Sequence, residues 1–196
     1  MRLTFFALTA AVLFAALPAQ ASTMPTLEQI HAAVQAGVAK TQARTQSSMP
    51  FAIKVTSLQG CQDSLEVPGE VVCLVRMSAG MRDGFNVLPL RKEGDTWVGV
   101  ERKRAKFAGP SPAEAQAMVR AWAKEEVARN PELAKDAQMQ DAQSTMQVTA
   151  MNECEVRRST GYVACDAMLS MPSRPEGIKT ELTFMLESAG WRYVPR

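Results

Sequence analysis

The sequence contains a single histidine, His31, among 196 residues. A nucleophilic serine or cysteine needs a neighbouring base and a group that orients this base. No serine lies in a nucleophile-elbow pattern, and His31 falls one turn after Leu27 on a predicted helix. We therefore expect His31 to be a helix-face residue and the protein to have no catalytic residues. A carboxylate pair brought together by the fold, as in glycoside hydrolysis, stays open as an alternative.

An excess of charge of one sign is also absent. Lys plus Arg total 22 and Asp plus Glu total 20, a formal net charge of +2. Proteins that bind nucleic acid usually carry a basic stripe, so the total charge predicts no nucleic-acid partner. Beyond the first residues, no apolar stretch approaches the roughly 20 residues of a membrane-spanning helix. We expect no transmembrane segment.

Residues 1–21 have the pattern of a secretory signal peptide. Arg2 precedes an apolar run from Leu3 to Leu17, and small residues follow at Ala19 and Ala21. A basic start, an apolar centre and small residues before the cleavage point define such signals. The sequence predicts cleavage after Ala21 and a mature protein in the periplasm or outside the cell.

The remaining chain repeats one pattern. The residues of the first copy are Val55, Thr56, Cys61, Gly69, Val71, Cys73, Leu88 and Trp97, and they return in the same order as Val148, Thr149, Cys154, Gly161, Val163, Cys165, Leu182 and Trp191. The spacing differs by only a residue or two between the copies. We therefore expect two tandem repeats, residues 22–106 and 107–196.

Cysteine is scarce, and all four cysteines belong to the repeated pattern. In an oxidising compartment an even number of cysteines favours disulfides. Because each copy holds one pair, the repeat favours Cys61–Cys73 and Cys154–Cys165 among the three possible connectivities. A zinc site of four thiolates is the alternative, but structural zinc ligands usually lie two to four residues apart. We predict no metal and no cofactor.

Each repeat predicts one helix followed by four antiparallel strands. Thr26 with Gln29, and Ser111 with Glu114, form capping-box patterns that begin a helix. Alternating apolar residues then predict strands. In the first copy these strands are 51–55, 71–77, 86–91 and 96–101, with Pro89 indicating an edge strand or a bulge, and in the second copy they are 147–153, 162–169, 180–186 and 191–194. A helix packed on a four-stranded sheet, twice, is an α+β fold.

The last hairpin of each copy adds a resemblance. The segments from Leu88 to Val98 and from Leu182 to Val194 each place a glycine turn before a tryptophan strand. They resemble the end of small cystatin-like envelope domains, which implies a curved sheet wrapped around a single helix. Tandem units with one disulfide each are also similar in plan to secreted protein inhibitors.

Methionine is the one abundant residue of note, with 12 in the chain. Thioether sulfurs suit monovalent copper, and Met77 with Met81 and Met168 with Met171 are closely spaced. A copper-handling or structural envelope protein is therefore one alternative. Methionine also fills irregular gaps in a core, and we favour this interpretation because no histidine accompanies the sulfurs.

The two copies differ most in the charge of their loops. Arg157 and Arg158 occupy the second cysteine loop, where the first holds Asp63 and Glu66. Variable loops on a rigid frame are typical of recognition, so we predict a non-enzymatic inhibitor or immunity protein that neutralises a toxin or hydrolase. A small-ligand or enzymatic pocket between helix and sheet is the other alternative. The predicted partner-binding residues are Met81, Arg82, Asp83, Arg102, Lys103, Arg104, Arg157 and Arg158.

Overall fold

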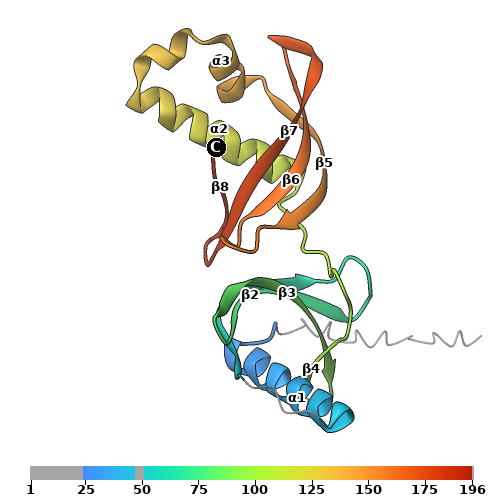
Figure 1. Cartoon of the computed structure of the whole chain (residues 1–196). Helices are drawn as coiled ribbons and strands as arrows, with labels where there is room; N and C mark the ends of the chain where they lie inside the picture. Colours follow the sequence, from blue (N-terminus) through green and yellow to red (C-terminus); the bar gives the residue numbers. More distant parts are fainter. Residues whose placement is uncertain (1–23, 47–50, 196) are drawn as a thin grey trace, which may run out of the picture.

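The computed structural model describes residues 24–46 and 51–195, and it consists of two halves with the same plan (Figure 1). The first half contains α1 (Leu27–Thr45), β1 (Ile53–Asp63), β2 (Glu70–Ala79), β3 (Arg82–Glu93) and β4 (Thr96–Gly99). The second contains α2 (Pro112–Arg129), η1 (Pro131–Lys135), α3 (Ala137–Ser144), β5 (Gln147–Val156), β6 (Val163–Met171), β7 (Arg174–Glu187) and β8 (Gly190–Tyr193). The predicted signal peptide lies outside the described residues.

Each half has one antiparallel four-stranded sheet, in the order β1-β2-β3-β4 and β5-β6-β7-β8. We call them the first and the second sheet. Each half also has one disulfide, Cys61–Cys73 or Cys154–Cys165, which joins paired residues or close neighbours on adjacent strands. The predicted α+β fold with one disulfide per repeat is confirmed. No helix in the described part of the chain has both the length and the apolar character needed to cross a membrane.

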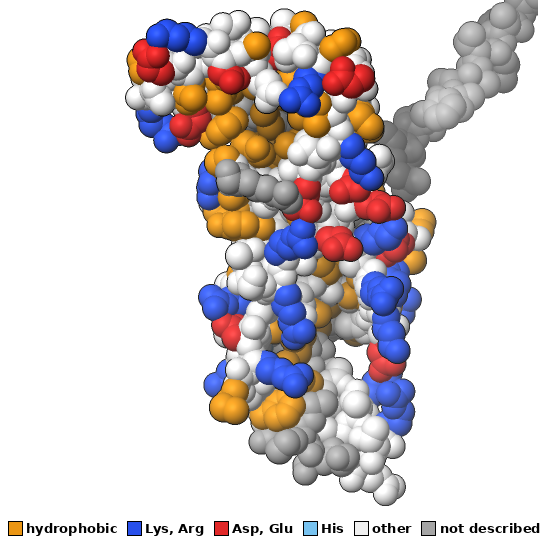
Figure 2. All heavy atoms as spheres, turned by 45° about the horizontal axis from the view of Figure 1, so that its top comes forward, with side chains coloured by type: hydrophobic (Ala, Val, Ile, Leu, Met, Phe, Trp, Pro, Cys, Tyr) orange, Lys and Arg blue, Asp and Glu red, His pale blue; other side chains and the backbone are white. Residues whose placement is uncertain are grey.

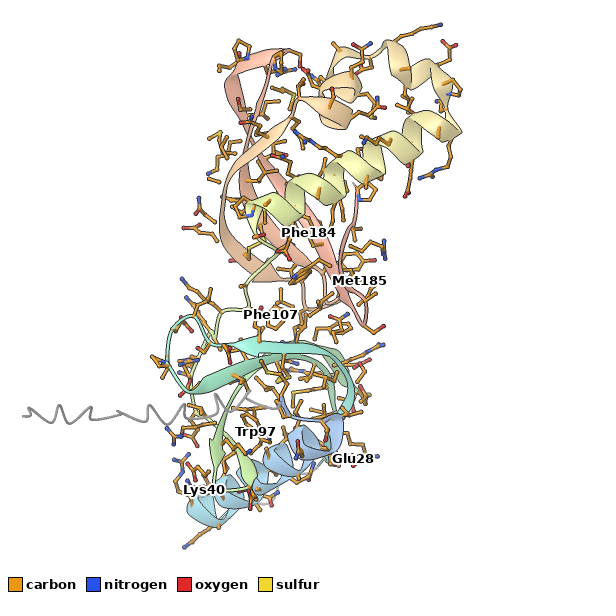
Figure 3. The ribbon with its side chains drawn as sticks, turned by 180° about the vertical axis from the view of Figure 1, so that it is seen from behind. Glu28, Lys40, Trp97, Phe107, Phe184 and Met185 are labelled. Atoms are coloured by element: carbon orange, nitrogen blue, oxygen red, sulfur yellow. A yellow bond between two sulfur atoms is a disulfide. The ribbon has the colours of Figure 1, made fainter. Side chains whose placement is uncertain are left out.

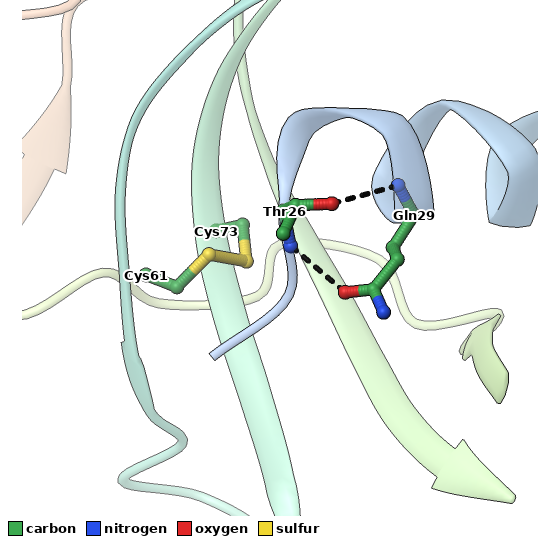
Figure 4. The surroundings of a disulfide bond; sticks show 4 residues. All are labelled: Thr26, Gln29, Cys61 and Cys73. Carbon is green, nitrogen blue, oxygen red and sulfur yellow. Dashed lines mark hydrogen bonds between the residues drawn. A yellow bond between two sulfur atoms is a disulfide. The ribbon is translucent and has the colours of Figure 1, made fainter. Parts of the chain in front are cut away.

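Both main helices begin at the predicted capping boxes. The Thr26 hydroxyl accepts a hydrogen bond from the Gln29 backbone N–H, and the Gln29 side chain accepts one from the Thr26 N–H at 2.9 Å (Figure 4). Ser111 and Glu114 repeat this exchange. The hydrogen bonds from Ser111 lower the pKa of Glu114. Because each box satisfies free N–H groups of the first turn, both helices start at a defined residue.

In both halves, one side chain of the helix accepts a hydrogen bond from the backbone of the edge strand. His31 Nδ1 accepts a hydrogen bond from the Val55 N–H at 3.4 Å, and Gln116 Oε1 accepts one from the Val148 N–H at 3.1 Å. His31 and Gln116 stand at equivalent positions after the cap, and Val55 and Val148 are equivalent in the repeat. The single histidine of the chain thus serves the packing of helix on strand.

The first sheet curves around α1 (Figure 1). Ile30 of α1 is fully buried against a core that includes Trp97, which points from β4 toward the helix (Figure 3). The other buried members of this core are Ala33, Val55, Val71, Cys73, Val75 and Leu90. Alternate residues of each strand face the helix, as the period of a β-strand requires.

Pro89 lies at an edge on one side only, and there is no bulge. β3 pairs with β2 along its length without a register shift, but with β4 only from Leu90 onward. The Pro89 carbonyl accepts a hydrogen bond from the Val100 N–H at 3.0 Å. In an antiparallel strand the N and O of one residue point to the same side, so the missing N–H faces the side on which β4 has already ended. The proline therefore removes no hydrogen bond of the sheet.

The second half buries its methionines unevenly. Met146 and Met171 lie in the core with Phe184, whereas Met168 is exposed on the outer face of the second sheet. Asp166 also lies on this outer face, where it pairs with Lys179 at 3.3 Å. The two methionines inside the core fill space between helix and sheet, as the favoured interpretation of the sequence holds.

A buried carboxylate fixes the α3 insertion. Asp141 accepts hydrogen bonds from the Ser173 N–H at 2.8 Å and from the Thr145 hydroxyl at 2.6 Å. These bonds join α3 to the β6–β7 hairpin. The bonds from Ser173 and Thr145 lower the pKa of Asp141 below its ordinary value of 3.8.

We expect Asp141→Asn to destabilise the protein at neutral pH. A carboxylate with a lowered pKa stabilises the fold while it is ionised, and this contribution is lost as the pH falls through the folded pKa. The difference in unfolding free energy between wild type and variant should therefore shrink below pH 3.8. Urea unfolding followed by tryptophan fluorescence at neutral and acid pH measures it. If the difference in unfolding free energy stays constant with pH, this result would contradict an ionised Asp141 carboxylate in the folded protein.

The two halves pack directly on each other. Val72 and Leu74 on the outer face of the first sheet, opposite α1, are fully buried in the apolar cluster of the second half. Phe107 of the linker is 2% exposed and lies between the halves, with its ring 6.3 Å from that of Trp191 (Figure 3). The apolar cluster of the second half thus continues across the junction, while the core under α1 is a separate cluster.

Glycines permit this close approach. A Cβ added to Gly161 would lie 2.7 Å from a Phe85 ring carbon, and one added to Gly60 would lie 2.6 Å from a Leu186 methyl carbon. Contacts below 3.0 Å require the neighbour to move. The Leu186 methyl group opposite Gly60 ends a flexible side chain that can shift, whereas Gly161 faces the Phe85 ring and also has φ +74°, so the junction depends most on Gly161.

Candidate functional site

The loop before β6 wraps around an open edge of the first sheet. β4 pairs only with the end of β3, from Leu90 onward, and leaves the beginning of β3 without a neighbour on that side. There the Arg158 carbonyl accepts a hydrogen bond from the Phe85 N–H at 2.8 Å. A Cβ on Gly84 would lie 3.0 Å from both the carbonyl oxygen and Cγ of Arg158. The second half therefore covers an edge that would otherwise be open to pairing.

Arg158 reaches from this edge into an open cleft of about 780 Å³. The cleft lies at the β2–β3 hairpin end of the first sheet, where Met77 and Leu88 also pack against the core under α1. Its lining combines apolar side chains with two arginines, and it draws on both halves. The lining residues are Phe51, Ile53, Met77, Ser78, Ala79, Gly80, Met81, Arg82, Asn86, Val87, Leu88 and Arg158.

Three of the predicted partner-binding residues meet in this cleft: Met81, Arg82 and Arg158. Met81 stands at the hairpin tip and is fully exposed, and Phe51 on the neighbouring strand end is 46% exposed. Two large apolar side chains in water at the mouth of a concave surface are typical of an interaction site.

The two arginines of the cleft are free to bind a ligand. Neither the Arg82 nor the Arg158 guanidinium has a hydrogen-bond or ion-pair partner among residues 24–46 and 51–195. The described lining contains no carboxylate, histidine, cysteine or lysine. The lining therefore offers two guanidinium groups, apolar surface and the polar side chains of Ser78 and Asn86.

Two other predicted residues are held in ion pairs outside the cleft. Asp83 accepts three hydrogen bonds from Arg76, whose guanidinium also lies 5.8 Å from the Phe85 ring centre. Arg157 donates to Glu181 at 2.7 Å. Both pairs are partly exposed, and each joins neighbouring structural segments. Their charges are neutralised within the chain.

Arg102 holds the linker in place through ion pairs. Its Nη1 lies 2.8 Å from Glu70, which is only 5% exposed, and its Nε lies 3.6 Å from Glu66. These contacts tie the linker to the β1–β2 loop. Lys103 and Arg104, the next two predicted residues, are exposed on the linker and do not line the cleft.

We expect Arg102→Gln to lower the unfolding free energy by about 1–3 kcal/mol, because it leaves the Glu70 carboxylate buried without its cation. Urea unfolding measures this change. Lys103→Gln is the matched control and should cost little, since its side chain is exposed. A loss of partner binding in Arg102→Gln without loss of stability would return Arg102 to the binding surface.

Several site residues were missed by sequence reasoning. Phe51 and Ile53 were assigned to a strand and not to a site, and Gly84 was not singled out. The signal for Phe51 is its position at the start of an edge strand, next to a polar stretch. Arg158 was predicted from its charge alone. Its position over Gly84 depends on how the halves pack, which no local pattern indicates.

The described residues offer few side chains that could bind a metal ion. All four cysteines are in disulfides, and no group of three His, Cys, Asp or Glu side chains is placed to hold an ion. Exposed Met81 and Met168 lie on different halves. No protein-family model, curated protein or solved structure matches the chain significantly.

Proposed function

We propose that the protein is an exported, non-enzymatic binding protein that neutralises a protein partner such as a toxin or a hydrolase. The observation that carries this proposal is the cleft built by both halves, with Met81 and Phe51 exposed at its mouth and two arginines in its wall that have no side-chain partner among the described residues. Apolar side chains and arginine are the groups that dominate the binding energy of protein interfaces.

The frame around the cleft supports recognition. Each half is closed by a disulfide, and one apolar cluster contains residues of both halves. A surface held in its binding conformation loses little entropy when a partner docks. We therefore expect the two packed halves to bind a partner tightly and without a change of shape.

Export is part of the proposal. Two disulfides form and persist in oxidising compartments, and residues 1–21 have the pattern of a signal peptide. A periplasmic or secreted location would place the protein where it meets exported toxins and hydrolases. The curved sheet around a helix supports a kinship in plan with cystatin-like domains and secreted inhibitors.

A second function is favoured by the size of the cleft. Pockets for small ligands span about 300–1,000 Å³, and the cleft lies within this range. A ligand with an apolar body and an anionic group would match its lining. We rank this function second because the largest apolar side chains stand outside the cleft floor, in contact with water.

Site-specific photo-crosslinking in the source cells tests the proposal. A benzophenone amino acid at Met81 is expected to capture one dominant envelope protein in a one-to-one adduct. The same amino acid at Lys135, exposed in η1 of the second half and outside the cleft lining, is the control. The captured protein should lose its activity when titrated with the purified chain. Equal capture at both positions, or none at Met81, would contradict the proposal.

A further inference from the structure

We infer that the cleft binds an acidic and apolar segment of the partner protein, with carboxylates between Arg82 and Arg158 and a large apolar side chain on the floor. This inference rests on the proposed function and names the chemistry of the partner. It is argued from the charges of the cleft, from its floor and from its mouth.

Among the described residues, no acidic side chain balances the charge of the cleft. Asp83 lies next to Arg82 in sequence, but both of its oxygens accept hydrogen bonds from Arg76. Glu181 likewise binds Arg157, the neighbour of Arg158. These two acids are therefore engaged, and the two cleft arginines have no acidic partner in the described part of the chain. A guanidinium forms its best contacts with a carboxylate, through parallel hydrogen bonds.

Arg82 and Arg158 come from different halves, yet their positions are fixed. Arg82 begins β3, and Arg158 is held by its backbone bond to Phe85 on the same strand. Two cations whose backbones are anchored on one strand, one within β3 and one hydrogen-bonded to it, select ligands with carboxylates at a matching spacing. On the face of the first half that Figure 2 shows, Lys and Arg side chains gather in several places. The surrounding field should attract an acidic partner.

The floor is apolar and adaptable. Met77, Ile53 and Leu88 are partly buried there and contribute aliphatic or thioether surface. Methionine has a flexible, polarisable side chain that adapts to the shape of its neighbour. A leucine, methionine or phenylalanine of a partner could displace water from this floor.

The mouth indicates a protein partner over a small molecule. Met81 is fully exposed and Phe51 is about half exposed, and both line the cleft. Both side chains therefore offer apolar surface to a ligand that crosses it. A partner chain that crosses the cleft would cover them together with the floor, as buried anchors surrounded by a polar rim.

Two pools of random dodecapeptides test the inference. One pool is drawn from Asp, Glu, Leu and Phe, and the other from the neutral isosteres Asn and Gln with Leu and Phe. We expect the oxidised full chain to bind the acidic pool about tenfold more tightly at low salt, and to lose this preference at high salt. Fluorescence polarisation measures both affinities.

Two double variants distinguish the effect of the cleft arginines from the effect of positive charge elsewhere on the protein. Arg82→Gln with Arg158→Gln should abolish the preference, while Lys103→Gln with Arg104→Gln removes the same charge from the exposed linker and should preserve it. The first variant keeps the Arg158 backbone bond, and thermal unfolding verifies its fold. Equal affinity for both pools, or equal loss in both variants, would overturn the inference.

A third probe, dodecanoate, distinguishes the class of ligand. Tight calorimetric binding of dodecanoate that excludes the peptides would overturn the inference in favour of a small-ligand pocket. Selective binding of the acidic pool without a captured envelope protein would leave the inference standing and reject the proposed function. The two failures are therefore distinguishable.

Discussion

Replacing Cys154 and Cys165 together by alanine should lower the unfolding free energy by about 3 kcal/mol, and replacing Cys61 with Cys73 should cost about as much. The two bonds close loops of similar length, with sequence separations of 11 and 12. A cross-link stabilises the fold mainly by restricting the unfolded chain, so equal loops predict equal losses. Urea unfolding of the four-cysteine protein and of each double variant measures them.

Gly109 provides a sharper test of the second disulfide. A Cβ at this position would lie 2.5 Å from Cys165 Sγ and 2.9 Å from Cys154 Sγ, because the linker crosses directly over the bond. Gly109→Ala should therefore cost about 1–3 kcal/mol in the wild type. In the Cys154→Ala, Cys165→Ala background the sulfurs are gone, and the cost should largely disappear. Additive losses in this double-mutant cycle would contradict the contact.

The second large effect is expected at Gly161. Its backbone has φ +74°, in the left-handed region, and an added Cβ would also lie 2.8 Å from Gln59 Oε1 and 2.7 Å from the Phe85 ring. Gly161→Ala should cost about 1–2 kcal/mol for the backbone, and about 1–3 kcal/mol more for the contact at the junction. The combined loss is a large share of the stability of a small protein.

The repeat contains the matched control for this prediction. Gly69 is the equivalent glycine of the first copy, has φ +79°, and has no atom within 4 Å of an added Cβ. Gly69→Ala should show the backbone cost alone. The difference between the two variants, measured by urea unfolding, isolates the packing of one half on the other. Equal losses would show that the junction tolerates a side chain there.

Local patterns in the sequence predicted most elements because they act over a few residues. The capping boxes at Thr26 and Ser111 begin both helices, and the disulfides follow from one cysteine pair in each copy. Pro89 indicated an edge or a bulge, and it lies at an edge only on the side of β4, because a proline removes only its own N–H and the effect of that loss depends on where the neighbouring strand ends. The end of β4 is a tertiary feature.

The sequence of β2 contains a signal for the junction between the halves. Residues Val71 to Val75 of β2 are apolar without interruption, whereas the equivalent run in β6 contains Asp166. A continuous apolar run indicates a strand buried on both faces, and only alternate residues of β2 were assigned to a core. Val72 and Leu74 therefore revealed a second covered face. The cleft itself could not be predicted, since Arg158 reaches it only through this packing.

The polar outer face of the second sheet has a consequence for assembly. Leu74, which receives the second half, is replaced by Asp166 at the equivalent position, paired with Lys179. A head-to-tail contact that is repeated on each new copy builds open filaments. Here the docking face is occupied intramolecularly, and its counterpart is charged. A further copy therefore cannot add through this contact, and this protects the molecule against polymerisation.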